Sequence, residues 1–253
     1  MAQSGDHGAL MDNVYRHQRH IYDLTRKYYL FGRDRVIRDL NLRPGEKLVE
    51  IGCGTARNLI AIARHYPGAE LYGLDASSEM LRTAQASLAK VALQARIALR
   101  QAYAEALDAT TFGPGSAPFD RVLFSYSLSM IPDWRGSIAA AAAVLKPEGL
   151  IHIVDFGDLA GIAPPFRRAL RVWLKVFHVE PRNEILGAVE DAVQGEAAHL
   201  WVSPGRYAFS LCCTPQTLAG LRLSNVALES QQRPKAEAVA PPLVDNPATH
   251  RPK

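Results

Sequence analysis

The chain has 253 residues, of which 48% are hydrophobic, and this suits one large domain with a packed core. Its formal net charge is +4, and its three cysteines, of which Cys212 and Cys213 are neighbours, indicate no disulfide framework or metal cluster. The sequence contains no run of about 20 apolar residues that could span a membrane, and its first residues lack the apolar core of a signal peptide. We therefore expect a cytoplasmic protein, and we expect no bound metal.

The N-terminal part of the chain is basic. Residues 1–11 have no apolar period, and we expect a mobile terminus there. Residues 12–40 are predicted to form one or two helices that cap the domain, with Gly32 as a possible break between them. Basic charge of this kind suits nucleic acid, an anionic membrane surface or plain solvation, so it does not choose a partner.

The most informative segment starts with an apolar strand at 48–51 that contains Glu50. Gly52 and Gly54 follow and let the backbone turn tightly beneath a ligand. A helix is predicted over 58–66, and a second strand over 71–74 then leads to Asp75. Strand, glycine turn, helix, strand and acid in this order are typical of a nucleotide-cofactor site, where the acid accepts hydrogen bonds from ribose hydroxyls.

Strands and helices continue to alternate after Asp75. Helices are predicted over 78–88, with Ser77 or Ser78 as N-cap, and over 137–145; strands are predicted over 97–101, 119–125 and 150–154, the last after a turn at 146–149. A hairpin of residues 201–202 and 207–212 completes the sheet. This order predicts a doubly wound, mostly parallel sheet with Asp75, Ser125 and Asp155 near its ligand-binding edge.

Residues 158–200 are predicted to form an insertion after the fifth strand that faces substrate or membrane. Within it, residues 165–178 place apolar side chains on one helical face, including Phe166 and Trp173, and basic side chains on the other. Such a helix lies in a membrane interface, covers the sheet or roofs a substrate site, and the pattern leaves these alternatives open. We assign 41–230 to the main domain and the proline-rich residues 231–253 to a disordered tail.

The glycine spacing distinguishes between cofactors. Gly52-x-Gly54-x-Ala56 resembles the E/D-x-G-x-G-x-G motif of class I S-adenosylmethionine-dependent methyltransferases, whereas a dinucleotide fingerprint would have a glycine at Arg57. Ala56 departs from the motif, and an alanine suits this position if its φ is negative. The resemblance implies a Rossmann-like sheet of seven strands, S-adenosyl-L-methionine as cofactor and S-adenosyl-L-homocysteine as product.

Further segments resemble this class and imply how the cofactor is held. Tyr22-Asp23 resembles a pair that closes the pocket, and Met80 would lie near the adenine. Tyr103 stands where many members have an aspartate, so its ring would stack on the adenine, donate its hydroxyl, or merely pack under the loop. The residues implied to bind the cofactor are Tyr22, Glu50, Gly52, Gly54, Asp75, Ala76, Met80, Tyr103, Ala104 and Ser125.

A closer resemblance concerns residues 15–26, 32–35, 50–55 and 124–132. These segments look like the N-methyltransferase of bacterial betaine-lipid synthesis, which methylates the amine of diacylglyceryl homoserine to form diacylglyceryl-N,N,N-trimethylhomoserine. The resemblance implies a lipid acceptor and a partner enzyme that makes the homoserine lipid. Together with the basic amphipathic helix, it favours peripheral contact with anionic lipid on the inner face of the cell membrane.

Methyl transfer to an amine depends on alignment and exclusion of water, because deprotonating an amino-acid ammonium at pH 7 costs only about 1.5–3 kcal/mol. Tyrosine rings could hold the methylated ammonium by cation–π attraction, and an arginine could bind the head-group carboxylate. The predicted catalytic residues are Tyr15, Tyr22, Tyr126 and Arg26. Ordinary packing of the rings and solvated helix charge are the alternatives.

Three other functions fit the same core. A nucleic-acid methyltransferase would use these arginines, but the Asn/Asp-Pro-Pro-Tyr type of motif is absent near 125–130, so we expect no nucleic-acid partner. A soluble methyltransferase acting on a quinone, phenol or amine is a stronger rival. A non-catalytic S-adenosylmethionine-binding protein is the third, and the intact residues Glu50, Gly52, Gly54 and Asp75 argue against it.

Overall fold

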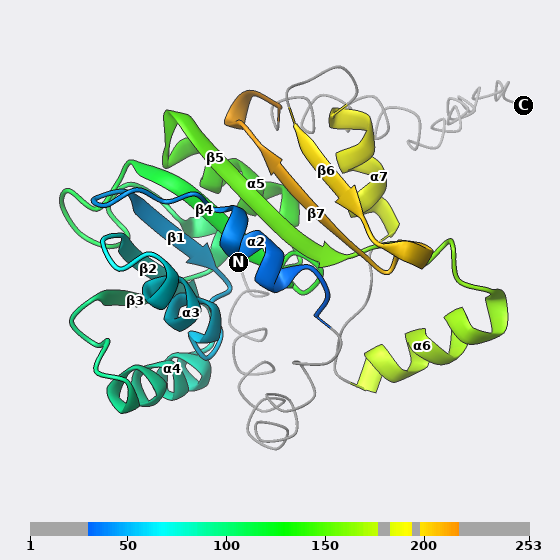
Figure 1. Cartoon of the computed structure of the whole chain (residues 1–253), viewed down its shortest axis with the longest axis horizontal. Helices are drawn as coiled ribbons and strands as arrows, with labels where there is room; N and C mark the ends of the chain where they lie inside the picture. Colours follow the sequence, from blue (N-terminus) through cyan, green and yellow to red (C-terminus); the bar gives the residue numbers. More distant parts are fainter. Residues whose placement is uncertain (1–29, 177–182, 194–197, 218–253) are drawn as a thin grey trace, which may run out of the picture.

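The computed structural model describes residues 30–176, 183–193 and 198–217, and the structural statements below concern these residues. A seven-stranded sheet lies at the centre, in the order β3-β2-β1-β4-β5-β7-β6 (Figure 1). Neighbouring strands from β3 to β5 pair in parallel, and β7 pairs antiparallel with both β5 and β6. The strands are β1 (Lys47–Ile51), β2 (Glu70–Asp75), β3 (Ile97–Gln101), β4 (Phe119–Ser125), β5 (Leu145–Phe156), β6 (His199–Val202) and β7 (Ala208–Cys213).

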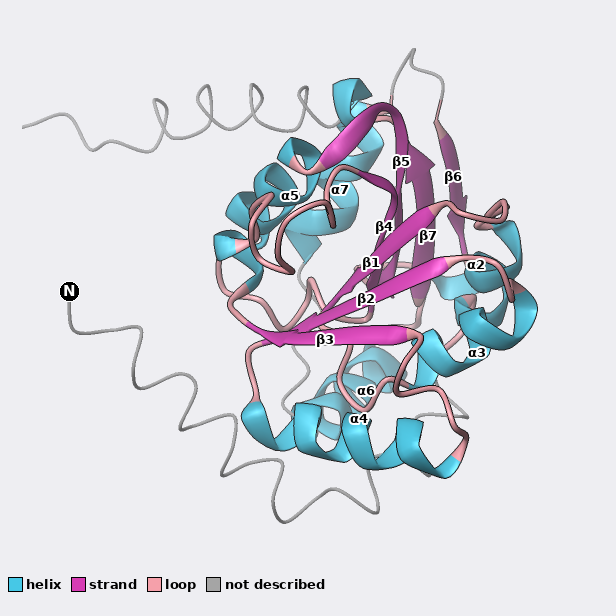
Figure 2. Ribbon diagram, turned by 90° about the vertical axis from the view of Figure 1, so that its left-hand side faces the viewer, coloured by secondary structure: helices cyan, strands magenta, loops and turns pink. Residues whose placement is uncertain are grey.

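Helices cover both faces of the sheet, as the doubly wound prediction requires (Figure 2). One buried cluster joins the sheet to α2, α3 and α4, and a second joins its other face to α5, α7 and the short helix η1. These elements are α2 (Arg33–Asp39), α3 (Arg57–His65), α4 (Ser78–Lys90), η1 (Ala104–Ala106), α5 (Trp134–Ala143) and α7 (Asn183–Ala192). α6 (Pro164–Val176) and η2 (Pro204–Arg206) complete the order.

Several local predictions are confirmed. β3 and β4 have the predicted bounds, and α3 differs from its predicted range by one residue at each end. Ser77 caps α4, because its side chain accepts a hydrogen bond from Met80 N at 3.2 Å. Gly32 is the N-cap of α2, with a left-handed φ of 84° that favours glycine. Whether it separates two helices stays a prediction, because residues 1–29 lie outside the described residues.

The turn predicted at 146–149 is wrong, because these residues lie inside β5. Phe119 of β4 faces Leu145, and Arg121 faces Leu150, so two steps along β4 correspond to five along β5. The extra residues form a bulge, which the turn residues favour without ending the strand. The bulge is tied to β4 by Lys146 Nζ, which donates to Asp120 Oδ1 at 2.7 Å.

The predicted insertion contains α6 and α7, which flank the undescribed residues 177–182. Among the helices that the structure describes, each is too short or too polar to cross a membrane.

Candidate cofactor site

The turn after β1 is held tightly at the carboxyl edge of the sheet. Gly52 N and Cys53 N both donate to Leu74 O of β2, at 2.8 and 3.0 Å. Gly52 has a φ of 74°, and a Cβ added there would lie 2.5 Å from Ser127 Cβ in the loop after β4. Only glycine fits between these two loops, so the backbone itself forms the floor of the site.

The backbone conformation of Ala56 differs from the one expected for an alanine at the third position of the motif. Its φ is 62°, so the negative φ expected for an alanine is wrong. A left-handed conformation costs a non-glycine residue about 1–2 kcal/mol. Gly52, Gly54 and Ala56 all have positive φ, at 74°, 53° and 62°. The turn therefore keeps a backbone suited to glycine at all three motif positions, although the third is alanine.

Two acids stand at the ends of the first two strands. Asp75 Oδ2 accepts from Gly54 N at 2.8 Å, and Asp75 Oδ1 accepts from Ser77 N at 2.9 Å. A carboxylate has about four acceptor positions, so these two backbone donors do not exhaust it. Glu50 is buried, and its Oε1 accepts from Asn58 Nδ2 of α3 at 2.6 Å, which fixes the carboxylate at the end of β1.

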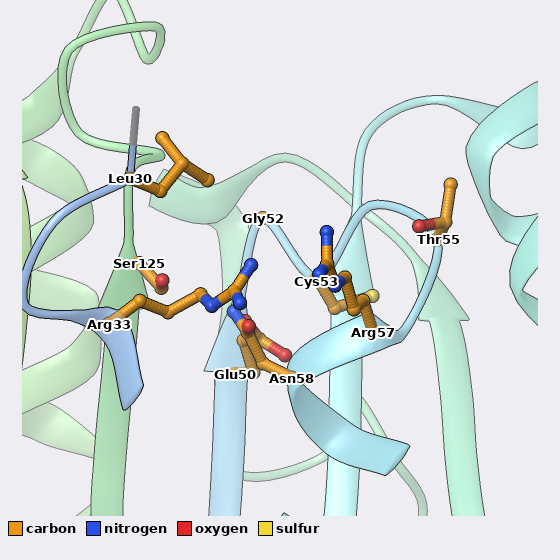
Figure 3. Close-up of a pocket in the computed structure, with 9 residues that line it drawn as sticks. All are labelled: Leu30, Arg33, Glu50, Gly52, Cys53, Thr55, Arg57, Asn58 and Ser125. Atoms are coloured by element: carbon orange, nitrogen blue, oxygen red, sulfur yellow. The ribbon is translucent and has the colours of Figure 1, made fainter. Parts of the chain in front are cut away.

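A pocket opens above these strand ends (Figure 3). Arg33 enters from α2 and reaches toward Glu50, while Arg57 projects from the start of α3. Ser125 faces the pocket from the end of β4, and its buried Oγ makes no hydrogen bond within the described residues. The pocket is lined by Leu30, Arg33, Glu50, Gly52, Cys53, Thr55, Arg57, Asn58 and Ser125.

These groups fit the amino-acid end and the ribose of S-adenosylmethionine. The two guanidinium groups suit a carboxylate, Glu50 suits an ammonium, and the buried Ser125 hydroxyl offers one further hydrogen bond. Burial, and then the charges of Asp75 and Glu50, raises the pKa of the Cys53 thiol well above its usual range. The thiol is therefore neutral and offers no thiolate that would compete for a methyl group.

Comparisons with known proteins agree with this chemistry. Residues 48–149 match the model of a family described as a methyltransferase domain. The chain contains a class I methyltransferase domain of the S-adenosylmethionine-dependent type. The matched segment runs from β1 to the bulge of β5, so it includes the glycine turn and Asp75.

Two relatives of this methyltransferase domain are named as quinone methyltransferases. The chain is 31% identical over 140 residues to a demethylmenaquinone methyltransferase of Corynebacterium efficiens, which covers 53% of this chain and 54% of the relative. It is 28% identical over 180 residues to the ubiquinone/menaquinone biosynthesis C-methyltransferase UbiE of Syntrophotalea carbinolica, covering 67% and 68%. The chain thus matches about half the length of the first relative and two thirds of the second.

Among solved structures, the chain resembles phosphoethanolamine N-methyltransferase 2 of Haemonchus contortus in complex with S-adenosyl-L-methionine. The TM-score is 0.52 at 17% identity, over 79% of this chain and 42% of that one. This likeness supports the fold alone. The betaine-lipid enzyme, the finer of the two sequence predictions, has no counterpart among the relatives named here.

The methyltransferase fold brings together five of the predicted cofactor residues, because they lie at the ends of β1, β2 and β4. These are Glu50, Gly52, Gly54, Asp75 and Ser125.

The residues predicted to contact the adenine of the cofactor lie on the opposite side of Asp75 from this pocket. Ala76 O accepts from Gln101 Nε2 at 3.0 Å, and Met80 is buried in the first turn of α4. Tyr103 is 36% exposed and precedes the buried Ala104 of η1. Contact of these residues with adenine stays a prediction.

Tyr126, a predicted catalytic residue, is packed into the methyltransferase fold. Its hydroxyl donates to Phe31 O at 2.5 Å, and its ring meets Phe156 edge-on with the centroids 4.7 Å apart. Burial raises the pKa of Tyr126 well above its usual range, so it remains a neutral phenol. The other three predicted catalytic residues, Tyr15, Tyr22 and Arg26, lie outside the described residues, and their roles stay predictions.

Sequence reasoning did not assign Arg33, Arg57 or Asn58 to the site. Asn58 and Arg57 follow the glycine turn directly, so their position at the start of α3 was a usable signal. Arg33 could not be distinguished from the other arginines of its segment, because its approach to Glu50 depends on how α2 packs on the sheet.

Proposed function

We propose that this protein transfers a methyl group from S-adenosylmethionine to a small organic acceptor, and that a quinol ring is the first acceptor to test. The observation that carries the proposal is the charged pocket at the glycine turn, which is lined by Arg33, Arg57 and Glu50 together with the tightly placed Gly52. The quinone methyltransferases among the relatives support the choice of acceptor.

The cofactor supplies an electrophilic methyl group on a sulfonium, which an acceptor takes by in-line displacement. For this reaction the protein has to position two molecules and exclude water. Asp75 would accept hydrogen bonds from ribose hydroxyls, while its own two backbone donors hold the carboxylate in place. Arg33 and Arg57 would bind the cofactor's carboxylate, and Glu50 its ammonium group.

A second candidate acceptor is the amine of diacylglyceryl homoserine. Two segments that carry the betaine-lipid resemblance, 32–35 and 124–132, border the same pocket through Arg33 and Ser125. An amine acceptor requires no strong base, because a neutral lone pair is available at modest cost. The parts of the resemblance in residues 15–26 lie outside the described residues.

Methyl transfer can be tested with isotopically labelled S-adenosylmethionine and two acceptors in detergent micelles, a short-chain demethylmenaquinol analogue and diacylglyceryl homoserine. We expect label in the organic extract of one acceptor, with an equal amount of S-adenosylhomocysteine formed. Asp75→Asn serves as the donor-site variant and should weaken cofactor binding at least tenfold, because the amide has one acceptor oxygen instead of two.

The outcomes separate the parts of the proposal. If calorimetry detects no binding of S-adenosylmethionine, the donor site is wrong. If the cofactor binds but neither acceptor gains label, the donor site stands and both acceptors are wrong. Methylation of the homoserine lipid alone would favour the amine over the quinol.

A further inference from the structure

The helix α6 packs on the fold through one narrow side. Leu174 is fully buried, and Leu170 packs against the cluster that contains Tyr126 and Phe156. Arg171 Nη2 also donates to Asp158 O in the loop after β5, at 3.3 Å. Leu174 follows Leu170 by four residues and Arg171 by three, so the three side chains lie on the inner side of the helix.

A second apolar surface lies on the outer side of α6. Phe166 is 72% exposed, Val172 61% and Trp173 38%, and these are three of the five large apolar side chains found exposed in the described residues. At 100° per residue, Phe166, Ala169, Val172 and Trp173 fall within one arc that faces away from Leu174. Figure 1 shows α6 projecting from the rest of the fold, so this outer apolar arc lies at the periphery of the molecule.

The sequence analysis predicted one apolar face, and the structure divides it. Leu170 and Leu174 face the fold, whereas Phe166 and Trp173 face outward. Single exposed apolar side chains are ordinary on a protein surface, whereas a contiguous group of them marks an interaction site.

A basic row runs beside the outer apolar arc. The helix sequence PPFRRALRVWLKV contains four basic residues and no acid. On the helical wheel they lie in one arc between Leu174 and Val172, and this arc includes Arg171 from the inner side of the helix. The four are Arg167, Arg168, Arg171 and Lys175. Their positive charge favours an anionic binding partner on this side of the molecule.

We propose that α6 lies in the interface of an anionic lipid bilayer, with Phe166, Val172 and Trp173 among the acyl chains and the basic row at the head groups. An exposed apolar arc flanked by basic residues is the pattern of a helix that lies flat on a membrane. Nucleic acid would use the basic row but would leave the apolar arc exposed to water. The inference stands without the proposed function, although a bilayer would also bring an amphiphilic acceptor to the enzyme.

The test is sedimentation of the full chain with vesicles of phosphatidylcholine alone or with 30% phosphatidylglycerol, at 50 and 500 mM NaCl. We expect binding to the anionic vesicles that falls at least tenfold at the higher salt, because the basic row is screened. Phe166→Ser/Val172→Ser should lower this binding at least tenfold. Both side chains face outward, so the thermal midpoint and the affinity for S-adenosylmethionine should not change.

A charge variant and a matched control complete the design. Arg168→Gln/Lys175→Gln should remove most of the salt-dependent binding, whereas Lys90→Gln/Arg100→Gln, two exposed cations on α4 and β3, should leave it within twofold. Equal binding to both kinds of vesicle, or unchanged binding by the apolar variant, would overturn the proposal. So would self-association that the apolar variant abolishes, or a preference for RNA over vesicles. Cofactor affinity is measured separately, so failure here leaves the methyl-transfer proposal intact.

Discussion

At Gly52 the backbone passes so close to the loop after β4 that a side chain has no space. A Cβ there would lie 2.5 Å from Ser127 Cβ, and the φ of 74° adds strain for any other residue. We predict that Gly52→Ala lowers the affinity for S-adenosylmethionine at least tenfold, because the loops must separate and the floor of the site moves. Isothermal titration calorimetry measures this loss.

Gly45 provides a matched control for the cost of placing an alanine in a left-handed backbone conformation. Its φ is 82°, but nothing lies within 4 Å of an added Cβ. Gly45→Ala should therefore cost about 1 kcal/mol of stability, as expected for a left-handed alanine, and leave cofactor affinity unchanged. Wild-type affinity in Gly52→Ala would show that the turn does not form the floor of the cofactor site.

The residues of the site differ in how far the sequence could reveal them. Gly52 and Asp75 were predictable, because a tight turn and a ribose acceptor each demand a particular residue type. Ala56 was misjudged, since its positive φ depends on how α3 leaves the turn. Arg33 was undetectable as a site residue, because its side chain enters the pocket only after α2 has packed on the sheet.

At the scale of elements, Arg206 connects the loop after β5 to α7. Its guanidinium donates to both carboxylate oxygens of Asp158, and it forms a two-pronged pair with Glu190 of α7 at 2.8 and 2.9 Å. Burial alone would raise the pKa of Asp158, but the hydrogen bonds from Arg206 and Ala160 N outweigh it and lower that pKa. The network therefore fixes the segment that leads into α6.

We predict that Arg206→Ala lowers the free energy of unfolding by about 1–3 kcal/mol, because two carboxylates lose charge-assisted hydrogen bonds. Arg206→Lys should recover less than half of this loss, since an ammonium cannot reproduce the two-pronged geometry. Urea unfolding measures both. Asp39→Ala, which breaks an exposed pair with Arg35 within α2, is the comparison and should cost less than about 0.5 kcal/mol. If Arg206→Ala lowered the free energy of unfolding equally little, Arg206 would not hold the loop after β5 against α7.

The elements were more predictable than their ends. The order of strands follows from alternating apolar runs and helical periods, so β3 and β4 were found with their bounds. β5 was shortened in prediction because Lys146-Pro147-Glu148-Gly149 has turn chemistry. Pairing with β4 absorbs those residues as a bulge, and pairing of this kind is tertiary information that the local sequence lacks.

At the scale of the whole molecule, two buried ionisable groups respond to pH in opposite directions. Burial raises the pKa of Asp155 from 3.8 to about 6, although hydrogen bonds from the Ser129 and Phe156 backbone partly oppose this. Burial, and then the charge of Arg121, lowers the pKa of His152 from 6.5 to about 4. Both residues lie on β5, and an apolar strand pattern gives no sign of either shift.

The direction in which each group changes stability with pH follows from the protons bound in the folded and unfolded states. Between pH 4 and 6 the folded protein keeps a proton on Asp155 that the unfolded chain has released, so stability falls by about 3 kcal/mol as the pH rises. Between pH 4 and 6.5 the unfolded chain binds a proton on His152 that the folded protein does not. This term therefore raises stability by about 3 kcal/mol over nearly the same window.

The two terms nearly cancel in the wild type, and single variants should separate them. Relative to wild type, the stability of Asp155→Asn should rise by about 3 kcal/mol from pH 4 to 6.5, because the opposing Asp155 term is gone. His152→Gln should show the reverse, a relative fall of similar size. Urea unfolding of all three proteins at intervals of half a pH unit measures the differences, in which the other carboxylates cancel. Parallel stability profiles would mean that neither buried group titrates differently in the folded and unfolded states.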